Sequence, residues 1–284
     1  MNRKQYILIG SGILLIGLLY FFGNRKGSQN PPQASAHNDA ANAEMPGNPA
    51  DAINSIDFAS YSIEATNKLS AEDKKTAQQL TDKAEKEKTA ITFKDIAEFW
   101  EKQNDLNMAA NYYKKAAFLE NTEKSVTFAG NLFLAVMQKT EQPEIRKWQA
   151  LEAIGCFNKA LELNPDNADT KIALATCYTE GTGETMKGVT LLREVTQKDS
   201  NNISANIVLG KLAIQSGQFD KAIKRLELVL SLRPENTEAM YFLAEAYKGS
   251  GNKEKAISLF EKCKKIVNNP EFTKEVDNYM NSFK

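Results

Sequence analysis

The chain has 284 residues, of which 42% are hydrophobic and 25% are charged, so it is long enough to bury a substantial core. Its 36 lysines and arginines balance its 36 aspartates and glutamates, and the two signs are interleaved along the chain. This argues against nucleic acid as the main partner, because a nucleic-acid-binding face needs clustered basic residues.

The first apolar segment is residues 6–22, which contain no charged residue. As a helix it would be about 26 Å long, close to the thickness of a bilayer core. We therefore expect a membrane anchor over residues 1–26. A cleaved secretory signal is the alternative, but Tyr20, Phe21 and Phe22 are bulky where a cleavage site needs small residues. Either interpretation carries the remaining chain out of the cytoplasm, which predicts a single-pass protein of a bacterial inner membrane with a periplasmic body.

The next segment, residues 27–52, is rich in Asn, Ala, Pro and Ser and has no apolar periodicity. Such a composition cannot bury enough surface to offset its chain entropy, so it predicts a flexible linker. Residues 53–89 contain few apolar residues but include a capping-box pattern from Ser70 to Asp73. We expect them to form a degenerate pair of helices that covers the start of the folded body.

The rest of the chain repeats itself with a period near 34 residues. A small residue recurs at spacings of 44, 35, 34 and 34, in the order Ala109, Ala153, Gly188, Ala222 and Ala256. Four positions after each stands a large apolar residue, in the order Tyr113, Phe157, Leu192, Leu226 and Phe260. A small or medium residue follows three positions later. Positions i, i+4 and i+7 share one face of a helix, so the pattern predicts a helical core face repeated five times.

A second helix-like segment lies before each of these stripes, and turn residues separate the two. Pro165 and Pro234 follow two of the stripes and end the helices there. The predicted array covers residues 90–269, with about five helix pairs and an insertion near residues 140–149. Residues 270–284 carry apolar residues at helical spacing and predict a helix that caps the array.

This pattern resembles the tetratricopeptide repeat family, which has small, large, small and proline residues at the relative positions of Ala222, Leu226, Val229 and Pro234. The resemblance implies an all-α fold, a right-handed superhelix of antiparallel helix pairs, here preceded by the N-terminal transmembrane helix. It also implies that other proteins or peptides are the partners.

The first helix of each pair lines the inner groove in this family. Carried over to this chain, the inward positions predict a partner-binding groove made of Ile172, Thr176, Thr179, Ile207, Lys211, Gln215, Glu238, Tyr241, Phe242 and Glu245. Their mixture of apolar and polar groups suits an extended peptide or a partner helix. The lysine and asparagine clamp with which some members hold C-terminal carboxylates is absent from the matching positions. Alternatively, Ile207 and Phe242 pack against adjacent helices.

Residues suited to catalysis are missing. The only histidine, His37, lies in the linker, so we expect no histidine-assisted nucleophile or metal site in the folded body. Cys156, Cys177 and Cys263 fall at or beside core positions, with a disulfide or a reactive thiol as the alternative. Residues 181–188 read GTGETMKG, which does not fit a phosphate loop and predicts a turn. We therefore predict no enzyme activity, no metal and no cofactor.

The leading functional hypothesis is a membrane-tethered scaffold that binds a peptide or partner protein in the groove. The alternative is a structural component of the cell envelope that assembles with copies of itself and needs no peptide ligand. A binder of polysaccharide or peptidoglycan is a third hypothesis. The sequence does not identify the partner.

Overall fold

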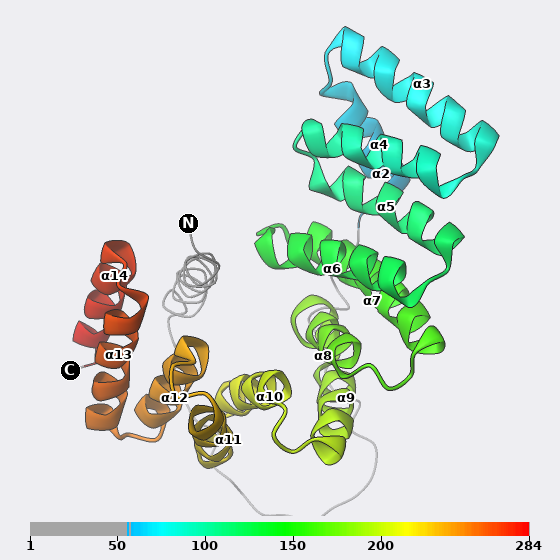
Figure 1. Cartoon of the computed structure of the whole chain (residues 1–284). Coiled ribbons are helices and arrows are strands. Elements are labelled where there is room, and N and C mark those ends of the chain that lie inside the picture. The colour runs from blue at the N-terminus through cyan, green and yellow to red at the C-terminus, as the bar shows by residue number, and fades with distance from the viewer. Residues whose placement is uncertain (1–55, 57, 284) are drawn as a thin grey trace, which may run out of the picture. The chain divides into compact units, whose positions relative to one another are not determined.

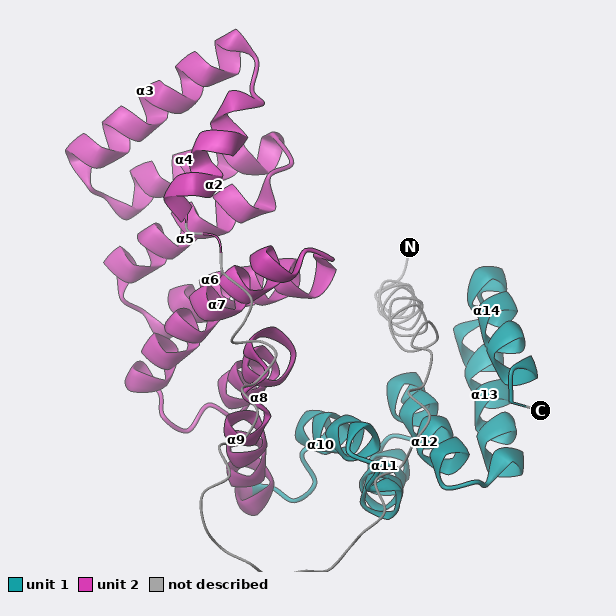
Figure 2. Ribbon diagram, turned by 180° about the vertical axis from the view of Figure 1, so that it is seen from behind, with its two compact units in different colours: residues 1–44, 199–284 teal, residues 45–198 magenta. Residues whose placement is uncertain are grey.

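The computed structural model describes residues 56 and 58–283, which form thirteen α-helices and one π-helical turn without any strand (Figure 1). The all-α prediction is thus confirmed. The chain divides into two compact units, which we treat separately (Figure 2). We call the described residues up to Lys198 the N-terminal unit, and those from Asp199 onward the C-terminal unit.

The predicted anchor at residues 1–26, its transmembrane part at 6–22 and the linker at 27–52 lie outside the described residues and stay predictions. Of the helices that the structure does describe, none is both long and apolar enough to cross a membrane.

In the N-terminal unit, consecutive helices pack against each other along the chain. They are α2 (Phe58–Asn67), α3 (Ala71–Glu87), α4 (Ala90–Lys102), α5 (Leu106–Glu120), α6 (Glu123–Lys139), α7 (Pro143–Leu163), α8 (Ala168–Thr176), the π-helical turn η2 (Cys177–Thr182) and α9 (Thr185–Lys198).

The C-terminal unit continues with the same kind of packing. Its helices are α10 (Ile203–Gln215), α11 (Phe219–Leu232), α12 (Thr237–Gly249), α13 (Lys253–Val267) and α14 (Pro270–Asn281).

Asparagine begins the first helix of several pairs. The side-chain oxygens of Asn167, Asn202 and Asn236 accept hydrogen bonds from the backbone N–H three residues later, at 2.9, 3.0 and 2.7 Å. Each bond satisfies one N–H that the first turn of a helix leaves without an intrahelical partner. Because the capping asparagine recurs in these repeats, the first helix of each begins at the corresponding position.

The predicted core stripes lie inside both units. In α11 the side chains of Ala222, Leu226 and Val229 are fully buried. The small residue of the stripe has a steric reason in α9, where a Cβ added to Gly188 would lie 2.5 Å from Thr179 Cγ2 and 2.8 Å from the Ala175 carbonyl oxygen. Tyr113 in α5 is the exception, because it is only half-buried.

The spacing of 44 residues between Ala109 and Ala153 is absorbed by longer helices. Helices α6 and α7 have 17 and 21 residues, compared with 13 and 14 in α10 and α11. The added residues of α7 pack against α2. Trp148, near the start of α7, is buried, and its ring centroid lies 5.2 Å from that of Tyr61 in α2. The insertion therefore provides part of the surface that holds α2.

The spacing of 35 residues between Ala153 and Gly188 has its own local cause. A π-helical turn accommodates one extra residue within a helix, and η2 lies between these two positions. Within it, a Cβ on Gly181 would lie 2.2 Å from the Cβ of Ala150 in α7. The predicted turn over 181–188 is thus shorter in the structure: residues 181–182 end η2, residues 183–184 connect it to α9, and α9 begins at Thr185.

All three cysteines are free and fully buried. Burial raises the pKa of the Cys156, Cys177 and Cys263 thiols to about 12 in each case. Since the thiolate is the reactive form, these neutral thiols act as small core groups, which confirms the core interpretation.

Candidate functional site

Four of the predicted groove residues are buried. In the C-terminal unit Tyr241 has no exposed surface, Phe242 is 2% exposed and Ile207 is buried with them in the same hydrophobic core. In the N-terminal unit Ile172 is also buried. For these four residues the structure shows packing within the unit.

The polar groove residues are more accessible. Thr176 and Thr179 are half-buried, and their hydroxyls donate hydrogen bonds to the backbone carbonyls of Ile172 and Thr176 at 3.1 and 3.2 Å. In the C-terminal unit Gln215 is exposed, while Lys211 and Glu238 are half-buried.

Glu245 is the predicted groove residue with the most unusual surroundings. Its side chain is 12% exposed, and Lys248 Nζ lies 3.6 Å from its Oε2. The Tyr279 hydroxyl of α14 donates to the same oxygen at 2.8 Å. Burial raises the pKa of Glu245, although Lys248 and Tyr279 act in the opposite direction. The carboxylate is therefore held inside the protein by a phenol and an ammonium group.

Helix α14 closes this end of the C-terminal unit. It buries Phe272, Val276 and Met280 completely. The ring of Tyr279 stands edge-on to that of Phe260 in α13, with centroids 5.7 Å apart. This is the arrangement expected of a helix that caps a repeat array.

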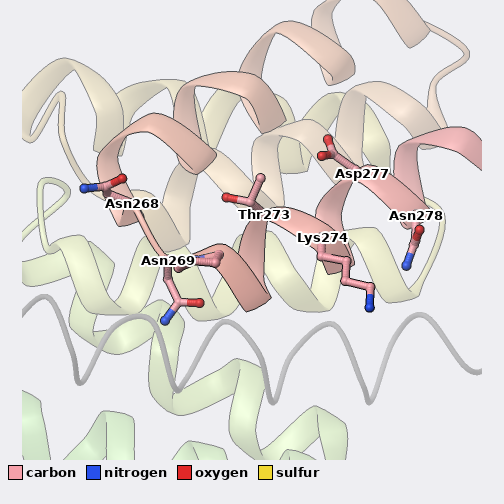
Figure 3. A pocket seen from close by; sticks show the side chains of 7 residues that line it. Asn268, Asn269, Thr273, Lys274, Asp277 and Asn278 are labelled. Atoms are coloured by element: carbon pink, nitrogen blue, oxygen red, sulfur yellow. The ribbon is translucent and has the colours of Figure 1, made fainter.

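A shallow depression lies at the start of α14 (Figure 3). Its wall is polar and comes from the turn after α13 and from one side of α14, with Asn268, Asn269, Pro270, Thr273, Lys274, Asp277 and Asn278. Asp277 is already paired with Lys264 of α13. The depression is open to solvent, and polar side chains and Pro270 form its lining.

A different surface stands out in the N-terminal unit, where sequence reasoning placed no site. Helix α6 carries a second apolar row in addition to the one that faces its core. Phe128 is 49% exposed, Ala135 is exposed, and Leu132 and Val136 are half-buried. Three of them, with residues of α4 and α5, line a small cleft of about 40 Å³. We call it the α5–α6 cleft, lined by Glu101, Leu106, Ala109, Ala110, Leu132, Ala135, Val136 and Lys139.

The carboxylate of Glu101 borders this cleft on the α4 side, and Glu98 lies one turn earlier on the same helix. The Tyr113 hydroxyl donates to Glu101 Oε2 at 3.0 Å, and its ring lies edge-on to that of Phe128 with centroids 5.5 Å apart. Burial, the hydrogen bond to Glu101 and the negative charges of Glu101 and Glu98 raise the pKa of Tyr113 to about 12. Within the described part of the chain, neither Glu98 nor Glu101 forms an ion pair.

The sequence contained a signal for this surface. The core row of α6 has Val126, Ala129, Phe133 and Met137, which is enough to pack one face of the helix. The second row, Phe128, Leu132 and Val136, exceeds what one packed face needs. It was missed because groove positions were carried over only to the regular repeats, and the insertion made this repeat irregular.

No metal centre accompanies either surface. Among the residues that the structure describes, no three His, Cys, Asp or Glu side chains gather where they could hold a metal ion.

Known proteins resemble this chain in its repeats. Residues 213–272 match the family model described as tetratricopeptide repeat. Superkiller protein 3 of Schizosaccharomyces pombe is 29% identical over 120 residues, which are 40% of this chain and 9% of that protein's length.

Two solved structures are also similar to this chain. A tetratricopeptide repeat protein from Parabacteroides merdae is 18% identical, with a TM-score of 0.50 over 68% of this chain and 73% of its own. YrrB, described as a TPR protein with an unusual peptide-binding site, is 23% identical with a TM-score of 0.44 over 71% of this chain and 99% of its own. The matched family model identifies a tetratricopeptide repeat at residues 213–272, and helix pairs of the same kind recur through the described residues.

Proposed function

We propose that this protein is a membrane-tethered scaffold that binds a partner protein or peptide through its tetratricopeptide repeats and catalyses no reaction. The observation that supports binding is the second apolar row of α6 with its cleft in the N-terminal unit. A half-exposed phenylalanine beside an apolar cleft, together with carboxylates that form no ion pair among the described residues, offers both buried area and charge for recognition.

The tether is the part of this proposal that rests on sequence alone. Residues 6–22 would span a bacterial inner membrane once, and residues 27–52 would let the repeats move in the periplasm. A protease added to spheroplasts of a bacterial host tests this arrangement. Degradation of an unprocessed, membrane-bound chain is the expected result, whereas protection would mean that the repeats face the cytoplasm.

Partner binding is tested by placing a photo-crosslinking phenylalanine analogue at Phe128 of the full-length chain in cells. The matched control carries the same analogue at Ser258, which is exposed on α13. We expect one partner protein to be crosslinked from position 128 and not from position 258. Equal crosslinking from both positions would contradict a binding surface on α6.

Self-assembly is the second candidate, and one observation favours it. Phe118 and Leu119 of α5 and Leu151 of α7 are large apolar side chains that are 41%, 51% and 45% exposed. Light scattering of the purified chain over a range of concentrations distinguishes the two. An oligomer that forms with concentration, combined with crosslinks only between copies of the chain, would favour the structural role.

A further inference from the structure

We propose that the α5–α6 cleft receives one aliphatic side chain from a basic segment of a partner protein, and that a lysine or arginine of this segment pairs with Glu98 and Glu101. This rests on the proposed function and adds the chemical class of the partner to it.

The size of the cleft sets the first part of the recognition. Its volume is about 40 Å³, and on this measure about 10–15 Å³ holds one water molecule. The cleft therefore has room for the branched end of one valine or leucine side chain. Its walls are methyl and methylene groups of Leu106, Leu132, Ala135 and Val136, so an aliphatic group gains more from entering than a polar one does.

The charges around the cleft set the second part. Glu101 lines the cleft, and Glu98 lies one turn earlier on the same helix, about 5 Å away along its axis. Both carboxylates are exposed, and no described lysine or arginine pairs with either. Lys139 is the single basic residue of the lining and stands on the other helix, α6. The α4 side thus presents two exposed carboxylates that form no ion pair among the described residues, with exposed Lys102 at the end of the same helix.

The distance between the two features fixes the spacing expected in the partner. A cation three or four residues from the aliphatic side chain on a helix, or two residues away on an extended chain, would reach Glu98 or Glu101. The Tyr113 hydroxyl holds Glu101 at 3.0 Å and so prepares this carboxylate for the cation. Nucleic acid does not fit, because its phosphates would face two carboxylates.

An unbiased peptide selection tests the inference without knowledge of the partner. A phage library of random 12-residue peptides is selected on the immobilised full-length chain, and the enriched peptides are then measured as fluorescent peptides by anisotropy. We expect them to share an aliphatic residue with a lysine or arginine two to four positions away. Their binding should weaken as the salt concentration rises from about 0.05 to about 0.5 M.

Four variants connect the binding to the cleft. Ala135→Arg fills the cleft from an exposed position, and we expect it to weaken binding by about tenfold or more. Leu106→Ser removes one wall and serves as a second disruption if the first variant misfolds. Gln138→Arg adds the same charge on α6 outside the lining and is the control, with unchanged binding. The double variant Glu98→Gln with Glu101→Gln should cost about three- to tenfold and remove most of the salt dependence.

The outcomes separate this inference from the proposed function. If the enriched peptides are acidic, or if they bind Ala135→Arg as well as the unmodified chain, the basic-segment proposal is wrong while peptide binding stands. If no peptide is enriched and no partner is crosslinked from position 128, both proposals fall.

Discussion

Helices α6 and α12 each open a helix pair, yet they differ greatly in burial. Nine of the thirteen residues of α12 are buried, compared with five of the seventeen residues of α6. Helix α12 has α10 packed directly on it and receives side chains from α14, whereas α6 leaves a cleft beside α5 and the end of α4. Corresponding positions of the two helices can therefore be buried in α12 and exposed in α6. Their burial depends on which helix packs against them.

The largest expected effect tests this difference with one substitution in each region. Phe260 of α13 is fully buried and stacks edge-on with Tyr241, whose centroid is 5.5 Å away. Phe260→Ala should lower the free energy of unfolding of the C-terminal unit by about 3–5 kcal/mol. The matched change Phe128→Ala, at a half-exposed side chain, should cost less than about 1 kcal/mol. Denaturant unfolding followed by circular dichroism measures both, and equal losses would mean that Phe128 is a core residue.

A smaller effect on stability is expected in the N-terminal unit, where η2 lies close against α7. Gly181→Ala would place a methyl group 2.2 Å from Ala150 Cβ and 2.8 Å from Met137 Sδ, so we expect a loss of about 1–3 kcal/mol. Gly155→Ala in α7 is the control, since a Cβ there meets nothing within 4 Å. It should raise stability by about 0.5–1 kcal/mol through better helix propensity. Thermal unfolding compares the two, and a harmless Gly181→Ala would show that η2 can move away from α7.

These particular residues show how far the sequence could predict the structure. Ala222, Leu226 and Val229 could be placed in the core because their spacing alone puts them on one helix face. The exposure of Phe128 could not, because it depends on how far apart the axes of neighbouring helices lie, and helix spacing is set by side chains of several repeats together. The buried state of Tyr241 has the same origin, since Phe260 of the neighbouring helix α13 packs against it. The extra residue before Gly188 was visible as a spacing of 35, although its π-helical form required the structure.

The capping residues predict a further, smaller effect. Asn236 begins α12 by accepting the Ala239 N–H at 2.7 Å, so Asn236→Ala should lower stability by about 1 kcal/mol. Asn236→Asp keeps an acceptor at the positive end of the helix and should restore most of that loss. Chemical unfolding of both variants measures it. Similar losses in both would show that the cap does not act through this hydrogen bond.

The smallest expected effect concerns pH and the closed end of the C-terminal unit. Because burial raises the pKa of Glu245 in the folded protein, its carboxyl loses a proton at lower pH in the unfolded chain. As pH rises, the carboxyl therefore ionises in the unfolded state first, and this ionisation stabilises the unfolded state. The free energy of unfolding should fall as pH rises from the unfolded pKa to the raised folded pKa. Above the folded pKa it should stay constant. Glu245→Gln cannot ionise, so its stability relative to the unmodified protein should increase over the same range.

Tyr279→Phe sharpens this pH test. Removing the hydroxyl that donates to Glu245 Oε2 takes away a bond that favours the ionised carboxylate. The folded pKa should then rise further, and the loss of stability should extend to higher pH than in the unmodified protein. Unfolding midpoints in urea between about pH 4 and pH 8 measure both changes. A pH profile that neither substitution alters would mean that the Glu245 carboxylate is well solvated, and α14 would then leave α12 open in the way that α6 is open.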